Sequence, residues 1–525
     1  MRPKIISLFS IISITLLIVV YFTSIRKSEI SFTERPNILF IMSDDHAESA
    51  ISAYGSELIH TPNIDRIAKE GIIFNNSFVT NSICAPSRAV LLTGKYSHMN
   101  GVRDNNQVFD GSQETFPKIL QSAGYETAMI GKWHLKSEPT GFNYWKILKG
   151  QGEYYNPLIV DSAGERNVEG YVTDIITDLA LETLESRDKD KPFAMLLHHK
   201  APHRNWMPNL KYLGAFEGKK FPLPETFYDD YSTRSLAAKE SDMRIDNMFL
   251  TWDMKLRPGD IEQETGSGGS GQVSGMIRDS YREWMNDEQR KIWETYYDSI
   301  SADFQNANLF GKALLEWKFQ RYMEDYLGVI LSVDENIGRI LEYLDKEGLT
   351  ENTIVIYTSD QGFYLGEHGW FDKRFMYEES LSMPLLMRYP KEIKAGQVSD
   401  NIVLNLDFAP TFLDYAGISA SNGMQGESLR LITEGVQPLD WRKSMYYHYY
   451  EYPHGWHFVK RHYGIRTDRY KLIHFYNDID SWELYDLEND PNEMKNLIYD
   501  MNYSQITAKL KNELYSLKKS FGETE

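Results

Sequence analysis

The chain carries, at residues 36 to 45, the run Pro36-Asn37-Ile38-Leu39-Phe40-Ile41-Met42-Ser43-Asp44-Asp45. Its apolar part is too short for a helix, and a proline before it and polar residues after it mark both ends. This pattern predicts a buried strand over Asn37 to Met42. A strand that is apolar on both faces is typical of a parallel sheet covered by helices.

Similar runs recur along the chain, separated by helical stretches. Further strands are predicted at Ile72 to Val79, Thr127 to Ile130, Phe193 to Leu197, Thr353 to Thr358 and Leu385 to Arg388. Helices are predicted at Thr61 to Gly71, which has a capping threonine and a first-turn proline, and at Tyr326 to Glu347, which Gly348 ends. Strands that alternate with helices indicate an α/β fold with a mixed, largely parallel sheet sandwiched by helices.

The pattern changes from about residue 440 to short tyrosine-rich strands. Tyr463 to Thr467 and Tyr470 to Tyr476 form a predicted hairpin around Asp468, and a helix is expected near Ile506 to Ser520. This predicts a smaller C-terminal α+β domain built on an antiparallel sheet.

The expected divisions of the chain are an N-terminal segment over 1–28, a catalytic domain over 35–435 and a C-terminal subdomain over 436–525. The glycine-serine run Gly266 to Gly271 is interpreted as a surface insertion, because related motifs lie on both sides of it.

The net charge of the chain limits the kinds of molecule that it can bind. The chain of 525 residues has a formal net charge of -19, which argues against nucleic acid, because phosphate binding needs a basic face. An anionic small substrate would also be repelled by the whole protein, so its site must gather cations locally.

The N-terminus has the layout of an export signal. Arg2 and Lys4 precede the apolar run Ile5 to Phe22, and Arg26 and Lys27 follow it. We expect an exported protein, either periplasmic or membrane-anchored and facing the periplasm or exterior. No clear cleavage site follows the run, so a cleaved signal and a retained membrane anchor both stay open.

The chain has a single cysteine, Cys84, which cannot form a disulfide within the chain. It is either a small buried hydrophobe or a chemically active group. Pro86 is placed like a first-turn residue and Gly94 like a helix terminator, which puts Cys84 at or just before a helix N-terminus. Such an end attracts anions, and Arg88 one turn later can point to the same place.

Two acidic sites follow predicted strands. Asp44 and Asp45 come after the first run, and Asp360 with Gln361 comes after a later one. Because the carboxyl ends of parallel strands form the ligand-binding edge, these groups are expected to converge. Their carboxylates would repel one another without a cation, and an all-oxygen set suits calcium or magnesium. The alternative for either site alone is ordinary helix capping.

The sequence Cys84-Ala85-Pro86-Ser87-Arg88 resembles the signature of type I sulfatases, in which a maturation enzyme converts the cysteine to formylglycine. It occurs with further motifs in that family's order over about residues 35 to 475: Ser43-Asp44-Asp45, Gly131-Lys132-Trp133-His134, Lys200-Ala201-Pro202-His203, Ser359-Asp360-Gln361-Gly362 and Asp372-Lys373-Arg374. The resemblance implies an alkaline-phosphatase-like fold and hydrolysis of sulfate esters.

The resemblance also implies a role for each motif residue. Asp44, Asp45, Asp360, Gln361 and the modified Cys84 would hold a divalent cation, calcium in the first place or magnesium. Arg88 and Lys132 would hold the formylglycine oxygens, and His134 would be the base that triggers sulfate elimination. His203 and Lys373 would bind sulfate and protonate the leaving oxygen. Outside these motifs a lone lysine or histidine is more often a surface charge or a core residue. Gln361 departs from the asparagine of many family members, which puts its exact coordination in doubt.

Three stretches resemble bacterial glycan sulfatases of the N-acetylglucosamine-6-sulfatase kind: Gly150 to Pro157, His198 to Arg204 and Asp372 to Ser380. The expected partner is therefore a sulfated carbohydrate, first of all one with 6-O-sulfated N-acetylglucosamine. Asp372, Trp456, His457 and His462 are candidate sugar-binding residues. The aromatic residues between Tyr446 and Tyr463 either line the mouth of the pocket or form the core of the small domain.

Two rival functions remain. One is a phosphonate or phosphate monoester hydrolase, because relatives with the same modified cysteine cleave phosphorus esters. The other is a catalytically silent glycan-binding homologue, against which the full set of charged motif residues counts.

Overall fold

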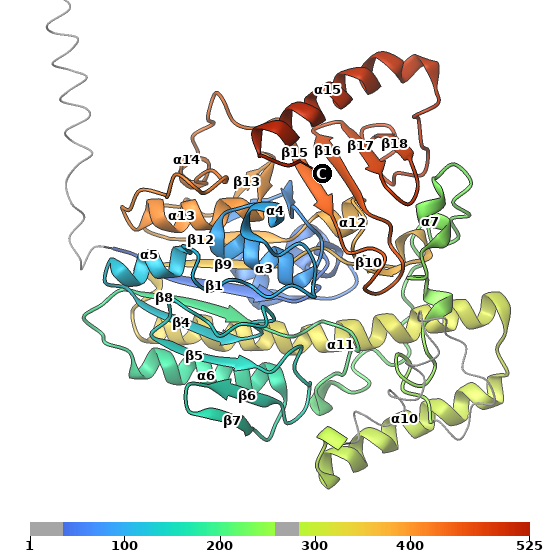
Figure 1. Ribbon diagram of the computed structural model, residues 1–525. Helices are drawn as coiled ribbons and strands as arrows, with labels where there is room; N and C mark the ends of the chain where they lie inside the picture. The colour runs from blue at the N-terminus through green and yellow to red at the C-terminus, as the bar shows by residue number, and fades with distance from the viewer. Residues whose placement is uncertain (1–34, 258–282, 525) are drawn as a thin grey trace, which may run out of the picture.

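A ten-stranded mixed sheet forms the centre of the molecule (Figure 1). The computed structural model describes residues 35–257 and 283–524. The strand order across the sheet is β13 (Gln397–Ser399), β2 (Ile72–Phe74), β12 (Leu385–Arg388), β9 (Thr353–Ser359), β1 (Asn37–Ser43), β8 (Phe193–His198), β4 (Glu126–Gly131), β5 (Tyr144–Leu148), β6 (Leu158–Asp161) and β7 (Gly164–Asn167). The five strands from β9 to β5 run parallel, and β12, β6 and β7 supply the antiparallel pairs. The prediction of a mixed, largely parallel sheet is confirmed.

Helices cover both faces of this sheet. The helices of the described residues are α2 (Pro62–Lys69), α3 (Cys84–Thr93), α4 (Ser97–Asn100), α5 (Phe116–Ser122), α6 (Val172–Ser186), α7 (Leu236–Glu240), α10 (Asp287–Ala307), α11 (Gly311–Lys346), α12 (Glu378–Leu381), α13 (Phe408–Tyr415), α14 (Arg430–Thr433) and α15 (Ser504–Ser520). Alternate side chains of β1 enter opposite cores: Leu39 and Ile41 pack with α2, α6 and α11, while Phe40 and Met42 pack with α3, α5 and α13. Burial on both faces explains why the central strands are apolar throughout.

Two predicted elements differ from the structure. The expected strand over 72–79 is two short strands, β2 and β3 (Ser77–Phe78), and β3 pairs instead with β14 (Val403–Leu404). The polar pair Asn75-Asn76 interrupts the run. The helix expected at 326–347 is the later part of α11, which starts at Gly311.

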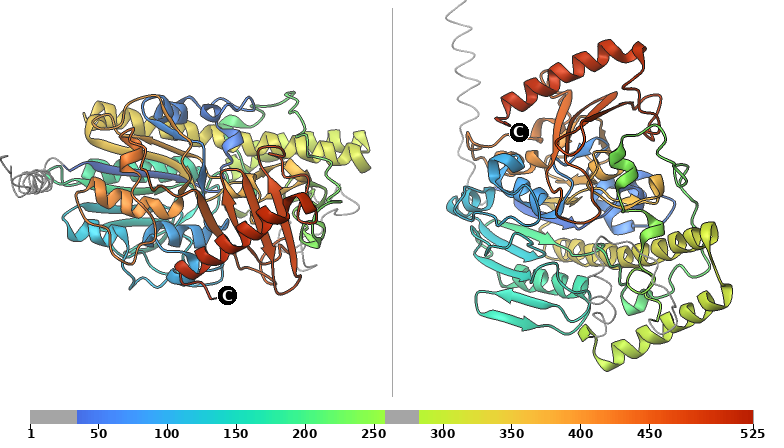
Figure 2. Two further views of the ribbon diagram at one scale, coloured as in Figure 1. Left: turned by 90° about the horizontal axis from the view of Figure 1, so that it is seen from above. Right: turned by 45° about the vertical axis from the view of Figure 1, so that its right-hand side comes forward.

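A four-stranded antiparallel sheet forms the C-terminal part, as predicted. It contains β15 (Ser444–Tyr449), β16 (His462–Thr467), β17 (Tyr470–Phe475) and β18 (Ser481–Asp486), and α15 lies across it (Figure 2). Its core is shared with the larger part of the molecule, because Phe78, Trp370 and Tyr377 pack into the same cluster as Tyr447 and Leu472. A short pair, β10 (Tyr364–Leu365) with β11 (Phe371–Asp372), lies between β9 and β12 in sequence.

Two predictions concern residues that the structure does not describe, the export signal over 1–28 and the insertion at Gly266 to Gly271. Among the helices of residues 35–257 and 283–524, none is long and apolar enough to cross a membrane. The domain boundaries at 435 and 436 stay predictions.

Candidate active site

Four parallel strands end side by side at one edge of the large sheet. Ser43 pairs with Ser359 in register, and His198 pairs with Met42 on one side and Gly131 on the other. The residues that directly follow these strands therefore meet. They are Asp44-Asp45 after β1, Asp360-Gln361 after β9, Lys132 after β4 and the segment His199 to His203 after β8.

Three buried carboxylates and one amide form the acidic part of the site. Oxygens of Asp44, Asp45 and Asp360 lie within 4.8 Å of one another. The Gln361 amide nitrogen donates to Asp45 and, at 2.8 Å, to Asp360 Oδ1. Its carbonyl oxygen is buried and has no hydrogen-bond partner among the described residues. An all-oxygen set with an unsatisfied carbonyl fits a hard divalent cation.

The proton affinity of these carboxylates reflects their crowding. Burial, followed by the nearby charge of Asp44, raises the pKa of Asp360 to about 7. Burial also raises the pKa of Asp45 to about 6, although Lys373 opposes the shift. For Asp44 burial acts in the same upward direction, but Lys132, His203 and Arg88 together hold its pKa well below the usual range. A bound divalent cation would favour the ionised form of all three.

Three buried cations also contact these carboxylates. Arg88 donates from Nε and Nη2 to Asp360 Oδ2 at 3.1 and 2.8 Å, Lys132 Nζ bonds to Asp44, and Lys373 Nζ lies 2.7 Å from Asp45 Oδ2. Arg88 further donates to the Lys132 carbonyl oxygen at 2.7 Å, which ties α3 to the end of β4. These residues are the local group of cations that an acidic protein needs in order to hold an anion.

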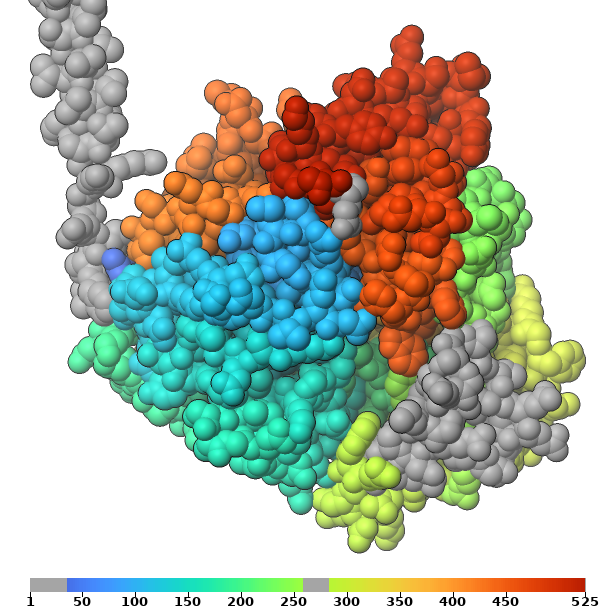
Figure 3. Space-filling view, viewed as in Figure 1, coloured from blue at the N-terminus to red at the C-terminus, as the bar shows by residue number. Residues whose placement is uncertain are grey.

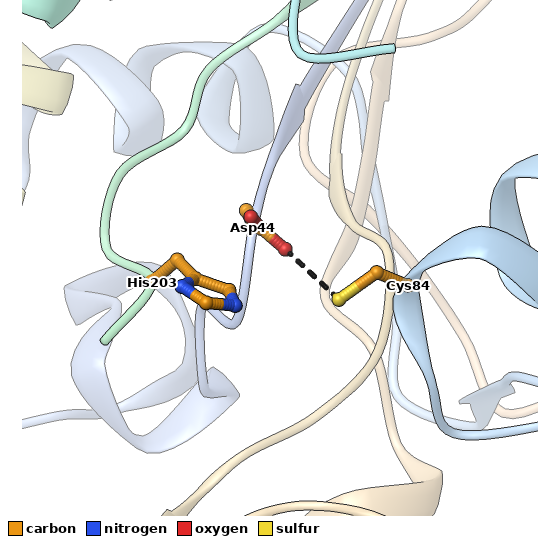
Figure 4. A group of neighbouring side chains, drawn as sticks. All are labelled: Asp44, Cys84 and His203. Atoms are coloured by element: carbon orange, nitrogen blue, oxygen red, sulfur yellow. Dashed lines mark hydrogen bonds between the residues drawn. The ribbon is translucent and has the colours of Figure 1, made fainter. Parts of the chain in front are cut away.

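Cys84 opens helix α3 and points at the same centre. Ile83 is the N-cap residue, so Cys84 is the first residue of the helix, as its sequence predicted. Its Sγ donates to Asp44 Oδ1 at 3.5 Å, and His203 lies on the other side of Asp44 (Figure 4). Burial raises the pKa of the Cys84 thiol well above its usual value, so the unmodified side chain stays protonated. A protonated thiol is a poor nucleophile, and this location gives an unmodified Cys84 little reactivity.

Two predicted histidines lie near these charges. His134 is the third residue after β4, and its Nδ1 has no hydrogen-bond partner among the residues that the structure describes. Burial and the nearby Lys132 lower the pKa of His134 well below its usual value. His203 Nδ1 bonds to the Arg204 carbonyl oxygen at 2.5 Å, which leaves Nε2 as the acceptor, 3.9 Å from Asp45 Oδ2. Burial and Lys132 lower the pKa of His203 as well, so both rings are neutral bases at neutral pH.

A cavity of about 620 Å³ opens above this centre. Cys84, Lys200, His203 and Lys373 lie among its lining residues, and Asn105, Asn106, Tyr154, Arg204, Trp252, Trp284 and Trp456 form other parts of its wall. This volume is in the range of ordinary small-molecule sites. The sulfate-binding residues predicted from the motifs therefore lie at the base of a cavity large enough for a sugar.

One wall of the cavity joins the two parts of the chain. Asp372 Oδ1 accepts hydrogen bonds from Arg374 Nε at 3.1 Å and from the Lys373 backbone at 2.7 Å. Arg374 Nη1 donates to Glu451 at 2.6 Å, and His457 Nε2 lies 3.4 Å from Asp372 Oδ2. The candidates Asp372 and His457 are thus part of one connected polar wall.

The prediction that His462 lies at the pocket mouth is wrong. His462 belongs to β16, is fully buried, stacks on Tyr447 and Tyr449, and bonds through Nδ1 to the Lys460 carbonyl oxygen at 2.7 Å. It does not line the cavity. Tyr446, Tyr447, Tyr449 and Tyr463 also belong to the third hydrophobic cluster, because β15 and β16 are buried on both faces. Trp456 differs, since it lines the cavity and is 44% exposed.

Several cavity residues were not singled out from the sequence. Lys200 belongs to a recognised motif, and its Nζ lies 4.9 Å from the centroid of the Tyr154 ring. Arg204 lies between the rings of Trp252 and Phe371, at 4.4 and 4.7 Å, and makes a bidentate ion pair with Asp253. Lys200 and Arg204 could have been identified as site residues from the sequence, because both lie in the stretch His198 to Arg204. Nothing local to residue 252 marks it as a site residue.

Comparisons with known proteins agree with this geometry. A family model described as Sulfatase matches residues 36–418, and a model described as N-sulphoglucosamine sulphohydrolase, C-terminal, matches residues 366–520. An N-acetylglucosamine-6-O-sulfatase of Bacteroides thetaiotaomicron is 52% identical over 506 residues, which cover 94% of this chain and 88% of that protein.

Solved structures share the fold. One, described as a complex with its substrate D-glucosamine-2-N,6-O-disulfate, is 52% identical, has a TM-score of 0.88, and is matched over 94% of this chain and 99% of its own. A phosphonate monoester hydrolase of Agrobacterium radiobacter is 20% identical, with a TM-score of 0.66 over 93% of this chain and 96% of its own. The second likeness shows the fold alone, so the architecture by itself does not separate sulfate from phosphorus esters.

Proposed function

The chain belongs to the sulfatase family, and from this premise we propose that it hydrolyses the 6-O-sulfate ester of N-acetylglucosamine in a sulfated glycan. The observation that carries the choice of sugar is the 52% identity, over nearly the whole chain, to a protein described as an N-acetylglucosamine-6-O-sulfatase. The polar wall of Asp372, Arg374 and His457 supports it, because hydroxyl groups of a sugar ring need such hydrogen-bond partners.

The proposal includes a formylglycine at position 84 and a calcium ion held by the three carboxylates and the Gln361 carbonyl. The formylglycine hydrate would supply an oxygen nucleophile, and the cation would lower its pKa and neutralise sulfate oxygens. The buried, protonated thiol supports the modification, since the unmodified side chain has little reactivity here. The choice of calcium over magnesium rests on the number of oxygen donors and their close spacing.

The chain's own cations hold the reacting group. Lys132 and Arg88 lie beside Asp44 and Asp360, where they stabilise negative charge at position 84. Despite its burial, contact with Asp45 holds the pKa of Lys373 well above its usual value, so it binds sulfate as a permanent cation.

The two neutral histidines move protons. His134 accepts a proton from the group at position 84, because its lowered pKa keeps the ring neutral and its Nδ1 has no hydrogen-bond partner within the described part of the chain. His203 presents Nε2 to the cavity and gains a proton only when an anionic substrate adds negative charge beside it. That proton then goes to the sugar oxygen as the sulfur-oxygen bond breaks.

The test is a panel of monosaccharides that each carry one sulfate. The matured protein should release sulfate preferentially from the 6-position of N-acetylglucosamine, and Cys84→Ala should release none. Preference for sulfated galactose or a sulfated uronic acid would overturn the proposed sugar. Mass analysis of the native peptide that contains position 84 should show an aldehyde in place of the thiol.

A phosphorus ester is the second candidate, because the phosphonate hydrolase shares the fold. Rates on a matched pair of aryl sulfate and aryl phosphonate esters separate the two. We expect the sulfate ester to react faster. An unmodified thiol with no turnover of either ester would instead indicate a glycan-binding homologue.

The location follows from the N-terminal segment, which has the charge and apolar pattern of an export signal. We therefore propose that the protein is exported, with a periplasmic or membrane-anchored form, and that a maturation enzyme acts on it. Fractionation of cells that express the full chain, followed by N-terminal sequencing, distinguishes a cleaved signal from an anchor.

A further inference from the structure

Helix α11 contributes a tyrosine that contacts the backbone of a proposed cation ligand. The helix runs along one face of the large sheet (Figure 1), and from the side shown in Figure 3 most of it lies behind the blue to green segments. Its residue Tyr326 is fully buried and does not line the active-site cavity. The Tyr326 hydroxyl donates to the Asp45 carbonyl oxygen at 2.8 Å and accepts from the Ala47 backbone at 2.9 Å. It therefore bridges the turn that follows β1, Asp44 to Ala47, which we call the ligand turn.

The ligand turn contains a backbone conformation that needs support. Asp45 has φ +67°, in the left-handed region that residues other than glycine rarely adopt. Such a conformation persists only where surrounding contacts hold it. The Asp45 N–H donates to Asp360 Oδ1 at 3.2 Å, and its carbonyl oxygen accepts from Tyr326. Of these two contacts, only the one with Tyr326 comes from a residue that is not itself a proposed cation ligand.

The hydroxyl is also the partner of two buried backbone groups. Asp45 is fully buried and Ala47 nearly so, which keeps water from replacing the hydroxyl without a movement of the chain. Removing it would leave the Asp45 carbonyl oxygen and the Ala47 N–H unsatisfied, which is costly for buried polar groups. We expect the ligand turn to shift in response, and the Asp45 carboxylate to shift with it.

The ring of Tyr326 supports the same ligand by a second route. It stacks on Phe363, with ring centroids 5.7 Å apart and planes inclined by 5°. Lys373 Nζ lies 5.8 Å from the centroid of the Phe363 ring and 2.7 Å from Asp45 Oδ2. The backbone and the carboxylate of Asp45 are thus both connected to Tyr326.

Other contacts hold helix α11 independently of its bond to the ligand turn. One turn earlier, Tyr322 donates to the Tyr364 carbonyl oxygen at 2.7 Å. Later in the helix, Asp334 Oδ1 accepts from the backbones of Asn63 and Ile64 at 3.0 and 2.9 Å. The helix should therefore stay in place when a single hydroxyl is removed, so that any change at the ligand turn reflects the lost bond itself.

We propose that Tyr326 is a positioning residue, which holds Asp45 in the conformation that binds the divalent cation. This inference rests on the cation site of the proposed function, and it adds to that site a residue from a helix that carries none of the motifs. Tyr326 acts through Asp45 and touches neither the cation nor the substrate. Its effect is consequently on the affinity for the cation, and not on the chemical step.

Calorimetric titration of calcium into protein freed of cations by a chelator tests this inference. Tyr326→Phe removes the hydroxyl and keeps the ring, and it should raise the Kd for calcium by about ten-fold, as is common when a hydrogen bond that orients a metal ligand is lost. The calcium concentration that gives half-maximal sulfate release should rise by the same factor. At saturating calcium, kcat should stay within about three-fold of the wild-type value.

The matched control is Tyr322→Phe, because Tyr322 is fully buried in the same helix and also donates one hydrogen bond to a backbone carbonyl oxygen. Both variants should lower the Tm of the cation-free protein slightly, but Tyr322→Phe should leave the Kd for calcium within about two-fold of wild type. An unchanged Kd in Tyr326→Phe, or an equal rise in both variants, would overturn the inference. A loss of kcat that saturating calcium does not restore would also overturn it.

The titration contains no substrate, so it separates this inference from the proposed function. A wild type that binds calcium but releases no 6-sulfate would refute the proposed sugar, and the comparison of the two variants would still decide the role of Tyr326. A wild type that releases 6-sulfate while Tyr326→Phe binds calcium equally well would reject the inference alone. A wild type that binds neither calcium nor magnesium would reject the inference together with the proposed cation.

Discussion

Gln361 shows how a single side chain identifies the cation site. Its nitrogen is used by two carboxylates, while its buried carbonyl oxygen has no partner among the described residues. A buried acceptor without a donor costs roughly 1 to 3 kcal/mol unless something else satisfies it. A divalent cation between Asp45 and Asp360 would do so and would also relieve the repulsion between the carboxylates.

Cation binding should therefore depend on pH. Burial raises the pKa of Asp45 to about 6 and that of Asp360 to about 7, above the value of about 3.9 in an unfolded chain. A carboxyl group with a raised pKa stabilises the fold at low pH, and this contribution is lost as pH rises through the folded value. Added calcium should consequently raise Tm markedly at about pH 8 and little at about pH 5.

Differential scanning fluorimetry with and without calcium measures this difference. Asp360→Asn should lose most of the calcium-dependent shift, whereas Asp178→Asn, an exposed carboxylate on α6, should keep it. A shift of equal size at both pH values would contradict the assignment of these carboxylates as ligands.

Two histidines five positions apart should behave in opposite ways. His457 lines the cavity beside Asp372, so His457→Ala should lower kcat/KM by roughly ten-fold with little loss of stability. His462 is buried between aromatic rings, so His462→Ala should lower the free energy of unfolding by roughly 2 to 4 kcal/mol. Steady-state kinetics and urea unfolding of both variants measure the contrast, and similar kinetic losses in both would contradict it.

At the level of elements, the ends of β1, β4, β8 and β9 position the site. Their parallel pairing brings Asp44, Lys132, Lys200 and Asp360 to one edge although these residues are far apart in sequence. Helix α3 then presents Cys84 from its first turn to the same edge. The geometry of the site therefore depends on how closely the strands approach.

Gly131 permits strands β4 and β8 to approach each other closely. It ends β4 with φ +100°, and a Cβ at this position would overlap the backbone carbonyl oxygen of His198 on β8. Gly131→Ala should therefore cost more than about 2 kcal/mol of folding free energy and displace Lys132, with a large loss of activity. Circular dichroism during denaturation and the rate of sulfate release measure the two effects.

Gly55→Ala is the control for this prediction. Gly55 also has a positive φ, of +88°, but apart from its chain neighbours no heavy atom of the described residues lies within 4 Å of its added Cβ. It should cost only about 1 kcal/mol and leave activity unchanged. Equal effects of the two substitutions would mean that backbone strain, and not strand spacing, controls the site.

For the whole molecule, the third hydrophobic core joins the two sheets. Phe78, Trp370 and Tyr377 from the larger part pack with Tyr447 and Leu472 from the C-terminal part. The buried ion pair between Arg374 and Glu451 crosses the same boundary at 2.6 Å. The active-site cavity is lined from both sides of this boundary, so neither part forms it alone.

This shared core predicts that the whole chain unfolds in one transition. Calorimetry should show a single peak, and Leu472→Ala in the C-terminal sheet should lower the stability of the whole molecule by about 2 to 5 kcal/mol. Activity and far-UV circular dichroism should be lost together on heating. An early separate transition of residues 436–525 would contradict the prediction.

The sequence alone determined the features that depend on neighbouring residues. The strand before Asp44, the helix that begins at Cys84 and the change to an antiparallel sheet near residue 440 all follow from local apolar patterns and from proline and glycine positions. The order of motifs also identified the residues that meet at the strand ends. These predictions succeeded because strand formation and helix capping are decided within a few residues.

Only the tertiary structure decided which polar and aromatic residues face the substrate. His457 lines the cavity and His462 is buried, although both lie in the same aromatic stretch, and Trp252 enters the wall from a segment without any motif. A second cavity likewise joins residues near 103 and 461. Exposure at each of these positions depends on packing between segments hundreds of residues apart, and no local pattern of apolar residues encodes that packing.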